Sequence, residues 1–362
     1  MNSKLNIRPV DQWLPLNNKP LIISGPCSAE SPEQVLETAQ QLAAGGNVNI
    51  LRSGIWKPRT RPNAFEGVGT EALSWLVDAG KATNLKTSTE VATSSHVEQA
   101  LKAGVDILWI GARTSTNPFS VQEIADSLKG VDVPVFVKNP INPDLNLWIG
   151  ALERINNAGI DKIGAIHRGF STFHQEYRNA PLWEIPLKLK TLFPNLPIIN
   201  DPSHISGKRE LLFTIAQKAL DLNMDGLMIE SHISPENALS DSLQQVTPEN
   251  FNQLIHDLRF RSGESQSETY NTRLEELRSQ IDQIDNELLD QIAKRMTVTK
   301  EIGLYKKQND VTPFQLDRWK EILETRQPFA VSKGLSPLFV DKLLQIIHDE
   351  SIKIQSSILN PK

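Results

Sequence analysis

Short apolar runs and helical stretches alternate along the first 260 residues of the chain. Each run is rich in β-branched residues and precedes a helical pattern of roughly 10–15 residues, which predicts right-handed βαβ units and a parallel sheet. We count eight runs. Eight units in about 240 residues match a (β/α)8 barrel, with an open doubly wound sheet as the alternative. The runs are Leu21–Gly25, Asn49–Gly54, Leu85–Val91, Ile107–Gly111, Pro134–Lys138, Lys162–His167, Pro197–Asp201 and Gly226–Glu230.

A different pattern follows residue 260. The segment RSGESQSETY is polar and aperiodic, so residues 261–271 are expected to link a barrel domain of residues 1–260 to a second domain of residues 272–362. Apolar residues then recur three or four positions apart, which predicts an amphipathic helix that ends at about Asn309. Pro313 opens a second helix, and Ser336-Pro337 opens a third that ends near Ser356. The second domain is therefore expected to be all-α, and its first apolar stripe is Leu274, Leu277, Ile281, Ile284, Leu288 and Ile292.

The length of the first C-terminal helix bears on the oligomeric state. About 36 residues at 1.5 Å each give a helix of roughly 54 Å. Two shorter helices of the same chain cannot cover an apolar stripe of that length. We therefore expect an intertwined homodimer through the helical domain, and a higher homo-oligomer is left open.

Composition and charge narrow the functional classes. The net charge of −5 argues against nucleic-acid and membrane-surface partners, which need a basic face. The single cysteine excludes an intramolecular disulfide and indicates a reducing compartment. No stretch approaches the roughly 18 apolar residues of a membrane span, and residues 1–18 lack the apolar segment of a signal peptide. We therefore expect a cytoplasmic protein that acts on small molecules.

Candidate metal ligands follow the ends of three predicted strands. The first strand ends in GPCSAE, the seventh in NDPSH and the eighth in IESH, and the sequence LSD follows the eighth strand. In a parallel barrel these segments share one mouth. A thiolate, an imidazole and two carboxylates form a divalent-metal set of mixed softness. The four residues are Cys27, His204, Glu230 and Asp241.

Cations crowd the same strand ends. Strand two leads into LRSGIWKPRTRP, and strands four, five and six end in IGAR, VFVKN and IHRG. Arginine and lysine inside a barrel mouth cost desolvation unless they bind anions or pair with acids. We therefore predict a substrate with phosphate and carboxylate groups, held by guanidinium forks and ammonium charges. The cations and their polar neighbour are Arg52, Lys57, Arg59, Thr60, Arg61, Arg113, Lys138 and Arg168.

These motifs together carry a family resemblance. GPCS, KPRT, STEV, IGAR, DPSH and the late ESH…SD pattern resemble the type I-beta 3-deoxy-D-arabino-heptulosonate 7-phosphate (DAHP) synthases over about residues 19–259. The resemblance implies condensation of phosphoenolpyruvate with erythrose 4-phosphate and release of phosphate, which is the first step of the shikimate pathway. It also implies a divalent metal cofactor, Mn²⁺ or, in substitution, Fe²⁺, Co²⁺, Zn²⁺ or Cd²⁺.

The same resemblance implies a role for each matching residue, with the four strand-end residues as metal ligands. Glu90 lies near the reacting centre in relatives, and with Lys138 it is our candidate for proton transfer or water orientation. His167 is a departure, because relatives usually carry Glu before the Arg-Gly pair. The implied substrate contacts are Arg113 and Lys138 for the phosphate of phosphoenolpyruvate, Arg52, Lys57 and Arg168 for its carboxylate, and Arg59 and Thr60 for the phosphate of erythrose 4-phosphate.

The helical domain carries a second resemblance. Its motifs LRSQIDQIDNELLDQIAKR, KEIGLYK and IIHDESIKIQ are similar to the AroQ-class chorismate mutases, all-α dimers that rearrange chorismate to prephenate. Arg295 and Lys306 are 11 positions apart, about three turns, and Ser351 and Gln355 are i,i+4 neighbours, so each pair shares a face. The resemblance implies a substrate site made of Arg278, Arg295 and Arg318 for the carboxylates, Lys306 and Gln355 for the ether oxygen, and Ser351.

Spacing along the first helix places one of these residues in a different subunit. Arg278 lies 17 residues before Arg295, which is roughly 25 Å along one helix and too far for chorismate to touch both. Arg278 would therefore act in the partner's site. There are two departures from the mutase pattern. Trp319 replaces a Glu that helps to bind the hydroxyl of chorismate in many relatives, and Gln315 replaces an acid one turn earlier.

Three interpretations of the whole chain follow. The main one is a bifunctional enzyme, a DAHP synthase followed by a chorismate mutase. A second keeps the barrel but changes the aldehyde, as in the synthases of eight- or nine-carbon sugar acids, and the KPRT motif and the mutase fusion argue against it. In the third, the helical domain is mainly an allosteric sensor of chorismate or prephenate that regulates the synthase, and Trp319 keeps this alternative open.

Overall fold

The computed structural model describes residues 4–14, 16, 20–58, 64–172, 176–261 and 265–361, which fall into two compact units, Met1–Gly263 and Glu264–Lys362. The first unit is a closed barrel of eight parallel strands in chain order. This confirms the predicted (β/α)8 fold and excludes the open doubly wound sheet. The strands are β1 Leu21–Gly25, β2 Ile50–Arg52, β3 Lys86–Val91, β4 Ile107–Ile110, β5 Val135–Lys138, β6 Ile163–His167, β7 Ile198–Asn200 and β8 Gly226–Glu230.

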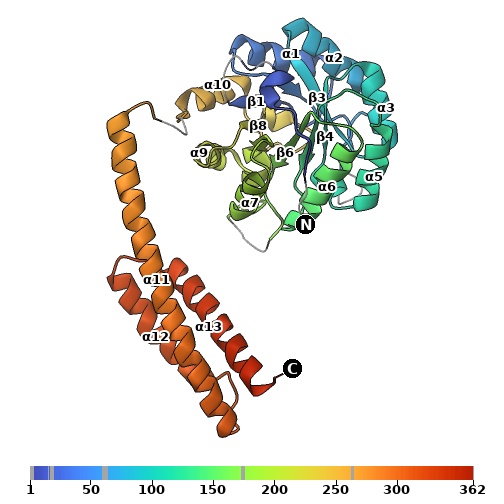
Figure 1. The fold of residues 1–362 in the computed structure, drawn as a ribbon. Coiled ribbons are helices and arrows are strands. Elements are labelled where there is room, and N and C mark those ends of the chain that lie inside the picture. The colour runs from blue at the N-terminus through green and yellow to red at the C-terminus, as the bar shows by residue number, and fades with distance from the viewer. Residues whose placement is uncertain are drawn as a thin grey trace. The chain divides into compact units, whose positions relative to one another are not determined.

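Helices form the outer ring of the barrel (Figure 1). Many begin at a polar cap: the side chain of Ser31 accepts from the backbone of Gln34 at the start of α1, and Thr93 and Asp144 cap α3 and α6 in the same way. The helices are α1 Pro32–Ala44, α2 Ala72–Thr83, α3 Ser94–Ala103, α4 Ala112–Ser115, α5 Pro118–Ser127, α6 Leu145–Asn157, α7 Glu184–Leu192, α8 Pro202–Ser206, α9 Leu212–Asp221 and α10 Pro248–Asp257, with 3₁₀ turns at Val10–Gln12, Arg209–Leu211 and Pro235–Asn237.

Two apolar clusters fill this unit. The larger lies between the strands and the outer helices, and the smaller fills the barrel interior with residues such as Trp109 and Phe136. Gly164 on β6 makes room for Phe136, because a Cβ at this position would lie 2.3 Å from its ring. Leu14, which precedes β1, joins the interior cluster and is 5% exposed. Because the interior is packed, the chemistry of a barrel of this kind is expected at the carboxyl ends of its strands.

The second unit consists of three helices, α11 Glu268–Gln308, α12 Leu316–Ser332 and α13 Pro337–Leu359. This confirms the all-α prediction. Helix α11 begins earlier than expected because the Ser267 side chain caps it by accepting from Tyr270 N, so residues 268–271 of the expected linker are helical. Helix α12 begins at Leu316, three residues after Pro313, and α13 begins at the expected Ser336-Pro337 pair.

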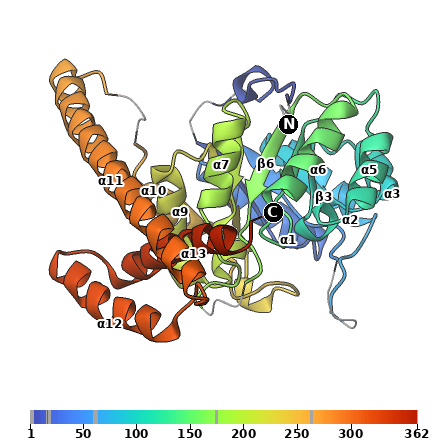
Figure 2. The same ribbon diagram turned by 60° about the horizontal axis from the view of Figure 1, so that its bottom comes forward.

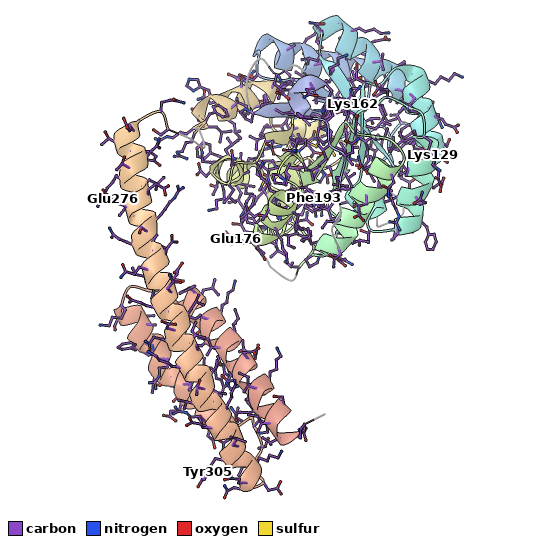
Figure 3. The ribbon with its side chains drawn as sticks, in the orientation of Figure 1. Lys129, Lys162, Glu176, Phe193, Glu276 and Tyr305 are labelled. Carbon is purple, nitrogen blue, oxygen red and sulfur yellow. The ribbon has the colours of Figure 1, made fainter. Side chains whose placement is uncertain are left out.

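The first part of α11 extends beyond α12 and α13 (Figures 1 and 2). Figure 3 shows Glu276 on this uncovered part and Tyr305 towards the other end of the same helix. Ile281, Ile284 and Leu288 are each more than half exposed here, at 58, 55 and 55%. The apolar stripe therefore lacks a cover within the described part of its own unit, and the intertwined dimer stays a prediction. No helix among the described residues has the length and apolarity needed to span a membrane.

Candidate active sites

Three of the four predicted metal ligands meet at the carboxyl end of the barrel. Cys27 follows β1, Glu230 ends β8, and Asp241 lies in the loop after β8. The β1–β8 register pairs Gly25 with Glu230 and so brings these segments together. One donor atom from each of the three lies within 4.8 Å of the other two, and Cys27 Sγ is 3.3 Å from Asp241 Oδ2. A thiol and two carboxylates that converge from three segments fit a divalent ion of intermediate softness.

His204, the fourth predicted ligand, lies beside this trio on α8. Its Nδ1 is 2.8 Å from Asp201 Oδ2, and its Nε2 is 3.7 Å from Glu230 Oε1. Asp201 also caps the helix, because its Oδ1 accepts from the backbone N of His204 at 3.1 Å. Because Nδ1 lies against the Asp201 carboxylate and Nε2 lies on the side of Glu230, Nε2 is the ring nitrogen that would bind a metal ion.

Burial and charge act in opposite directions on these groups. Burial raises the pKa of the Cys27 thiol to about 12, and Glu230 adds to the rise. Burial also opposes ionisation of Glu230, but His204 and Arg52 outweigh it and lower the pKa of that carboxyl. The pKa of Asp241 lies below its usual range because nearby cations outweigh its burial. The carboxylates are therefore ionised, and a metal ion would have to displace the proton of the thiol.

Two predicted cations line the trio directly. Arg52 is 1% exposed; its Nη1 donates to Glu230 Oε1 at 2.9 Å and its Nη2 donates to the carbonyl oxygen of Cys27 at 3.1 Å. Its guanidinium also lies over the ring of Trp109, 4.9 Å from the centroid. Lys57 Nζ is 2.9 Å from Cys27 Sγ. The two cations that follow or end β2 are therefore in direct contact with the predicted metal ligands Cys27 and Glu230.

Further predicted cations among the described residues, Lys138, Arg113 and Arg168, lie near one another at the same mouth. Lys138 Nζ donates to Asp201 Oδ2 at 2.9 Å, and both side chains are buried. Arg168 donates to Asn179 Oδ1 at 2.9 Å, and its pKa is lowered to about 10 by burial, with Arg113 among the cations that add to the effect. Buried cations of this kind suit an anionic ligand, as the sequence predicts.

Glu90 also faces this mouth from β3. Its Oε2 accepts from Trp109 Nε1 at 3.0 Å, and a Cβ at Gly111 would lie 2.1 Å from its Oε1, so glycine is needed at the end of β4. Three residues of the KPRT region, Arg59, Thr60 and Arg61, lie outside the described residues. The predicted contacts with erythrose 4-phosphate therefore stay predictions.

Two residues that contact the predicted ligands, Arg178 and Gln244, were not predicted from the sequence. Arg178 donates through Nη1 to Asp241 Oδ1 at 3.0 Å and to Gln244 Oε1 at 2.7 Å. Gln244 in turn donates from Nε2 to Glu230 Oε2 at 2.7 Å. Both lie in loops without periodicity, and only their position after strands six and eight could have suggested them. A cavity of about 550 Å³ opens beside Arg178 and Asp241 and is also lined by Tyr177 and Lys208.

His167, the departure noted in the sequence, is a buried neutral imidazole. Its Nε2 lies 2.6 Å from the carbonyl oxygen of Pro181, and its Nδ1 lies 3.0 Å from Asn200 Nδ2. This arrangement assigns the proton to Nε2, because a carbonyl only accepts and an amide NH₂ only donates. Burial lowers the pKa of His167 to about 4, which agrees with the neutral form. The charge of the usual Glu is therefore missing at this position.

Four of the six predicted mutase residues lie where α11 and α13 pack together. Arg295 Nη1 donates to Ser351 Oγ at 2.6 Å, and Ser351 and Gln355 are 5 and 7% exposed. Burial lowers the pKa of Lys306, whose Nζ donates to the carbonyl oxygen of Pro313 at 2.6 Å. The side-chain oxygen Oε1 of Gln355 is buried without a hydrogen-bond partner among the described residues.

The other two predicted mutase residues lie on the surface of the single chain. Arg278 is 60% exposed and pairs with Glu275, and Arg318 is 54% exposed and pairs with Glu321. Each pair is formed between two residues of the same helix, α11 for Arg278 and α12 for Arg318. Arg278 therefore does not lie beside Arg295 within the described chain. This agrees with their separation of roughly 25 Å along one helix.

The barrel mouth, with its thiol, carboxylates and buried cations, defines an anion-binding (β/α)8 enzyme with a candidate metal centre. Comparison with known proteins gives the family. Residues 14–261 match the DAHP synthetase I family and residues 277–356 match chorismate mutase type II. The chain belongs to the DAHP synthetase I family and carries a type II chorismate mutase domain at its C-terminal side, which confirms both resemblances.

Individual relatives agree with the family. The chain is 34% identical over 239 residues to a phospho-2-dehydro-3-deoxyheptonate aldolase of Thermotoga maritima, which covers 66% of this chain and 68% of the relative. A 2-dehydro-3-deoxyphosphooctonate aldolase of Caulobacter vibrioides is 25% identical over 265 residues, covering 66% of this chain and 85% of the relative. The crystal structure of the Thermotoga maritima DAHP synthase superposes with a TM-score of 0.62 at 30% identity over 70% of this chain and 72% of that chain.

Proposed function

We propose that the chain is a bifunctional enzyme in which the barrel makes DAHP and phosphate in a divalent-metal-dependent reaction and a helical dimer converts chorismate to prephenate. The observation that carries the first activity is the convergence of Cys27, Glu230 and Asp241 beside buried cations. A metal site alone would suit many hydrolases. A metal site within a wall of buried arginine and lysine suits a substrate with two anionic groups.

In the barrel reaction, the enol carbon of phosphoenolpyruvate attacks the aldehyde carbon of erythrose 4-phosphate. A bound divalent ion would supply Lewis-acid polarisation of the aldehyde oxygen. Water adds to the second carbon of phosphoenolpyruvate, and the resulting hemiketal phosphate collapses with loss of inorganic phosphate.

The protein's own residues bind and orient the substrates of this reaction. Lys138 and Arg113 would hold the phosphate of phosphoenolpyruvate, and Arg52, Lys57 and Arg168 its carboxylate. Fixing both substrates within reacting distance supplies a large part of the rate. Lys138, held by Asp201 at 2.9 Å, is placed to orient a water molecule or move a proton.

The mutase reaction is a unimolecular rearrangement, so its site need only hold the reactive conformer and stabilise charge on the breaking ether bond. Arg295, already oriented by Ser351, would bind one carboxylate. The Gln355 side-chain NH₂ and the Lys306 ammonium would donate to the ether oxygen, which only accepts. Arg278 of the partner subunit would complete the clamp. Dimer formation is thus part of this proposal.

Two assays on the intact chain test the proposal. Phosphate release from phosphoenolpyruvate should require erythrose 4-phosphate, stop after chelation and return with Mn²⁺. Turnover that survives exhaustive metal removal would contradict the metal role. Conversion of chorismate to prephenate tests the second activity. If chorismate binds without turnover while prephenate slows the synthase, the helical domain is the sensor of the alternative interpretation.

A further inference from the structure

One face of α13 presents three polar side chains at helical spacing, His348, Ser351 and Gln355. Ser351 is engaged by Arg295. The other two are not engaged: His348 Nε2 and Gln355 Oε1 are both buried, and neither has a hydrogen-bond partner in the part of the chain that the structure describes. Burying a polar atom without a partner is unfavourable, so two such atoms on either side of a site residue indicate a ligand that satisfies them.

The His348 ring is fixed in orientation by two aromatic side chains. Trp319 of α12 stacks on it with a centroid distance of 4.1 Å and an interplanar angle of 25°. Phe314, in the segment before α12, meets it edge-on at 5.9 Å. A ring clamped in this way loses little further freedom when it binds a ligand.

Burial, helped by two neighbouring cations, keeps His348 neutral. Burial lowers its pKa, Arg295 and Lys306 of α11 lower it further, and Asp349 opposes them without reversing the direction. A neutral imidazole offers one donor and one acceptor but no charge. Beside the cations proposed for anionic groups, it suits an uncharged hydroxyl.

We propose that His348 contacts the ring hydroxyl of chorismate through Nε2 and that Trp319 is the positioning residue that holds the imidazole in place. This inference rests on the proposed mutase function. Chorismate carries two carboxylates, one ether oxygen and one hydroxyl. The arginines take the carboxylates, and Lys306 and Gln355 take the ether oxygen. The hydroxyl is the polar group left over, and the unpartnered His348 Nε2 is a ring nitrogen that can pair with a hydroxyl, which both donates and accepts.

This contact also accounts for the Trp319 departure. A tryptophan in α12 cannot accept a hydrogen bond from the hydroxyl, because its indole N–H is only a donor. By stacking on His348, Trp319 instead orients a neutral imidazole of α13 towards the hydroxyl. This contact takes the place of the charged one that a Glu in α12 would make. Trp319 and His348 therefore act as one unit, and removal of either should affect recognition of the same hydroxyl.

A substrate-deletion cycle on the full-length chain tests the contact. Mutase kcat/KM is measured with chorismate and with 4-deoxychorismate, which lacks the hydroxyl, for the wild type, His348→Ala and His256→Ala. His256, 83% exposed on α10, provides the matched control. His348→Ala should lower kcat/KM for chorismate about 10-fold and for the deoxy analogue less than about 2-fold. Equal losses on both substrates, or no loss on chorismate, would overturn the contact.

Two further variants separate contact from packing. His348→Gln keeps a donor and an acceptor and should recover most of the chorismate activity without changing turnover of the deoxy analogue. Trp319→Leu should reproduce the selective loss of His348→Ala, since it releases the ring. A Trp319→Leu variant that discriminates the two substrates as well as the wild type does would overturn the positioning role.

The outcomes also separate this inference from the proposed function. If the wild-type chain makes no prephenate, the catalytic proposal fails, and calorimetric binding of chorismate and 4-deoxychorismate replaces turnover as the readout. His348→Ala should then weaken binding of chorismate alone. Unchanged chorismate affinity in His348→Ala would overturn the contact whether or not the domain is a catalyst.

Discussion

Replacing Arg52 with methionine should destabilise the barrel far more than removal of an ordinary surface cation. Both members of the Arg52–Glu230 pair are buried, at 1 and 0% exposure, and their charged atoms are 2.9 Å apart. Methionine keeps most of the apolar volume over Trp109 but leaves the Glu230 carboxylate buried without its guanidinium. Breaking a buried pair on one side costs about 3–5 kcal/mol.

Urea unfolding of the intact chain measures this cost. Tryptophan fluorescence reports mainly on the barrel, because Trp319 is the sole tryptophan after residue 263 of the sequence. With a slope near 3 kcal/mol per molar urea, the barrel midpoint should fall by roughly 1–2 M. Arg8→Ala is the matched control: it also breaks one arginine–carboxylate pair, with Asp161, but the side chains of this pair are 41 and 25% exposed. Its expected cost is at most about 1 kcal/mol.

A second variant tests the cause. Adding Glu230→Gln to Arg52→Met removes the orphaned charge and should recover part of the lost stability, since the two changes act on one interaction. Equal midpoint shifts for Arg52→Met and Arg8→Ala would refute the argument that burial makes this pair matter. A double variant less stable than the sum of its single changes would refute it as well.

Three predictions concern activity. Cys27→Ala should abolish Mn²⁺ binding, measured by calorimetry, and synthase turnover, while mutase turnover is kept; full synthase activity without metal would contradict this. Arg59→Ala should raise KM for erythrose 4-phosphate selectively, by about 2–4 kcal/mol in apparent binding, and an equal rise for phosphoenolpyruvate would count against the assignment. Co-expressed Arg278→Ala and Arg295→Ala chains should regain mutase activity in the heterodimer, because one of its two sites keeps both arginines; no recovery in a verified heterodimer would exclude the shared site.

The barrel could be predicted from the sequence because its signals are local. The expected strand Asn49–Gly54 contains the observed Ile50–Arg52, and Gly226–Glu230 matches to the residue. Strand ends in a parallel barrel converge by topology, so Cys27 and Glu230 could be placed together without knowing a single contact. The same logic failed for Arg178, because its loop has no periodicity and its contact with Asp241 depends on how two loops fold against each other.

Contacts between helices could not be predicted from the sequence for a similar reason. Periodicity gives the face of a helix but not its partner, so the stacking of Trp319 on His348 could not be read from either position alone. The burial of Leu14 could not be predicted either. Leu14 is an apolar residue in a polar segment, and no local sequence pattern indicates that it packs inside the barrel. The start of α11 was misplaced because one capping serine outweighed the polar composition of the segment around it.

Helices α11 and α13 approach each other closely at Gly303. A Cβ at this position would lie 3.0 Å from Ile358 Cδ1 and 3.3 Å from Gln355 Cα. The end of the Ile358 side chain can move, but Gln355 Cα moves only if α13 moves. Gly303→Ala gains up to about 1 kcal/mol of helix propensity, which should offset the strain and leave the melting temperature nearly unchanged.

Catalysis should be less tolerant of this change than stability, because it depends on where Gln355 lies and not only on whether the helices stay packed. Gly303→Val adds bulk that costs about 1–3 kcal/mol and displaces Gln355, and misplacement by about 1 Å can cost on the order of 100-fold in rate. We therefore expect mutase kcat to fall at least about 10-fold in Gly303→Val and measurably in Gly303→Ala, with synthase turnover unchanged. Gly150→Ala, in α6 where a Cβ would meet only Arg154 Nη1 at 3.8 Å, is the control for propensity alone. Wild-type mutase kcat in a stably folded Gly303→Val chain would show that the position of Gln355 does not control the reaction.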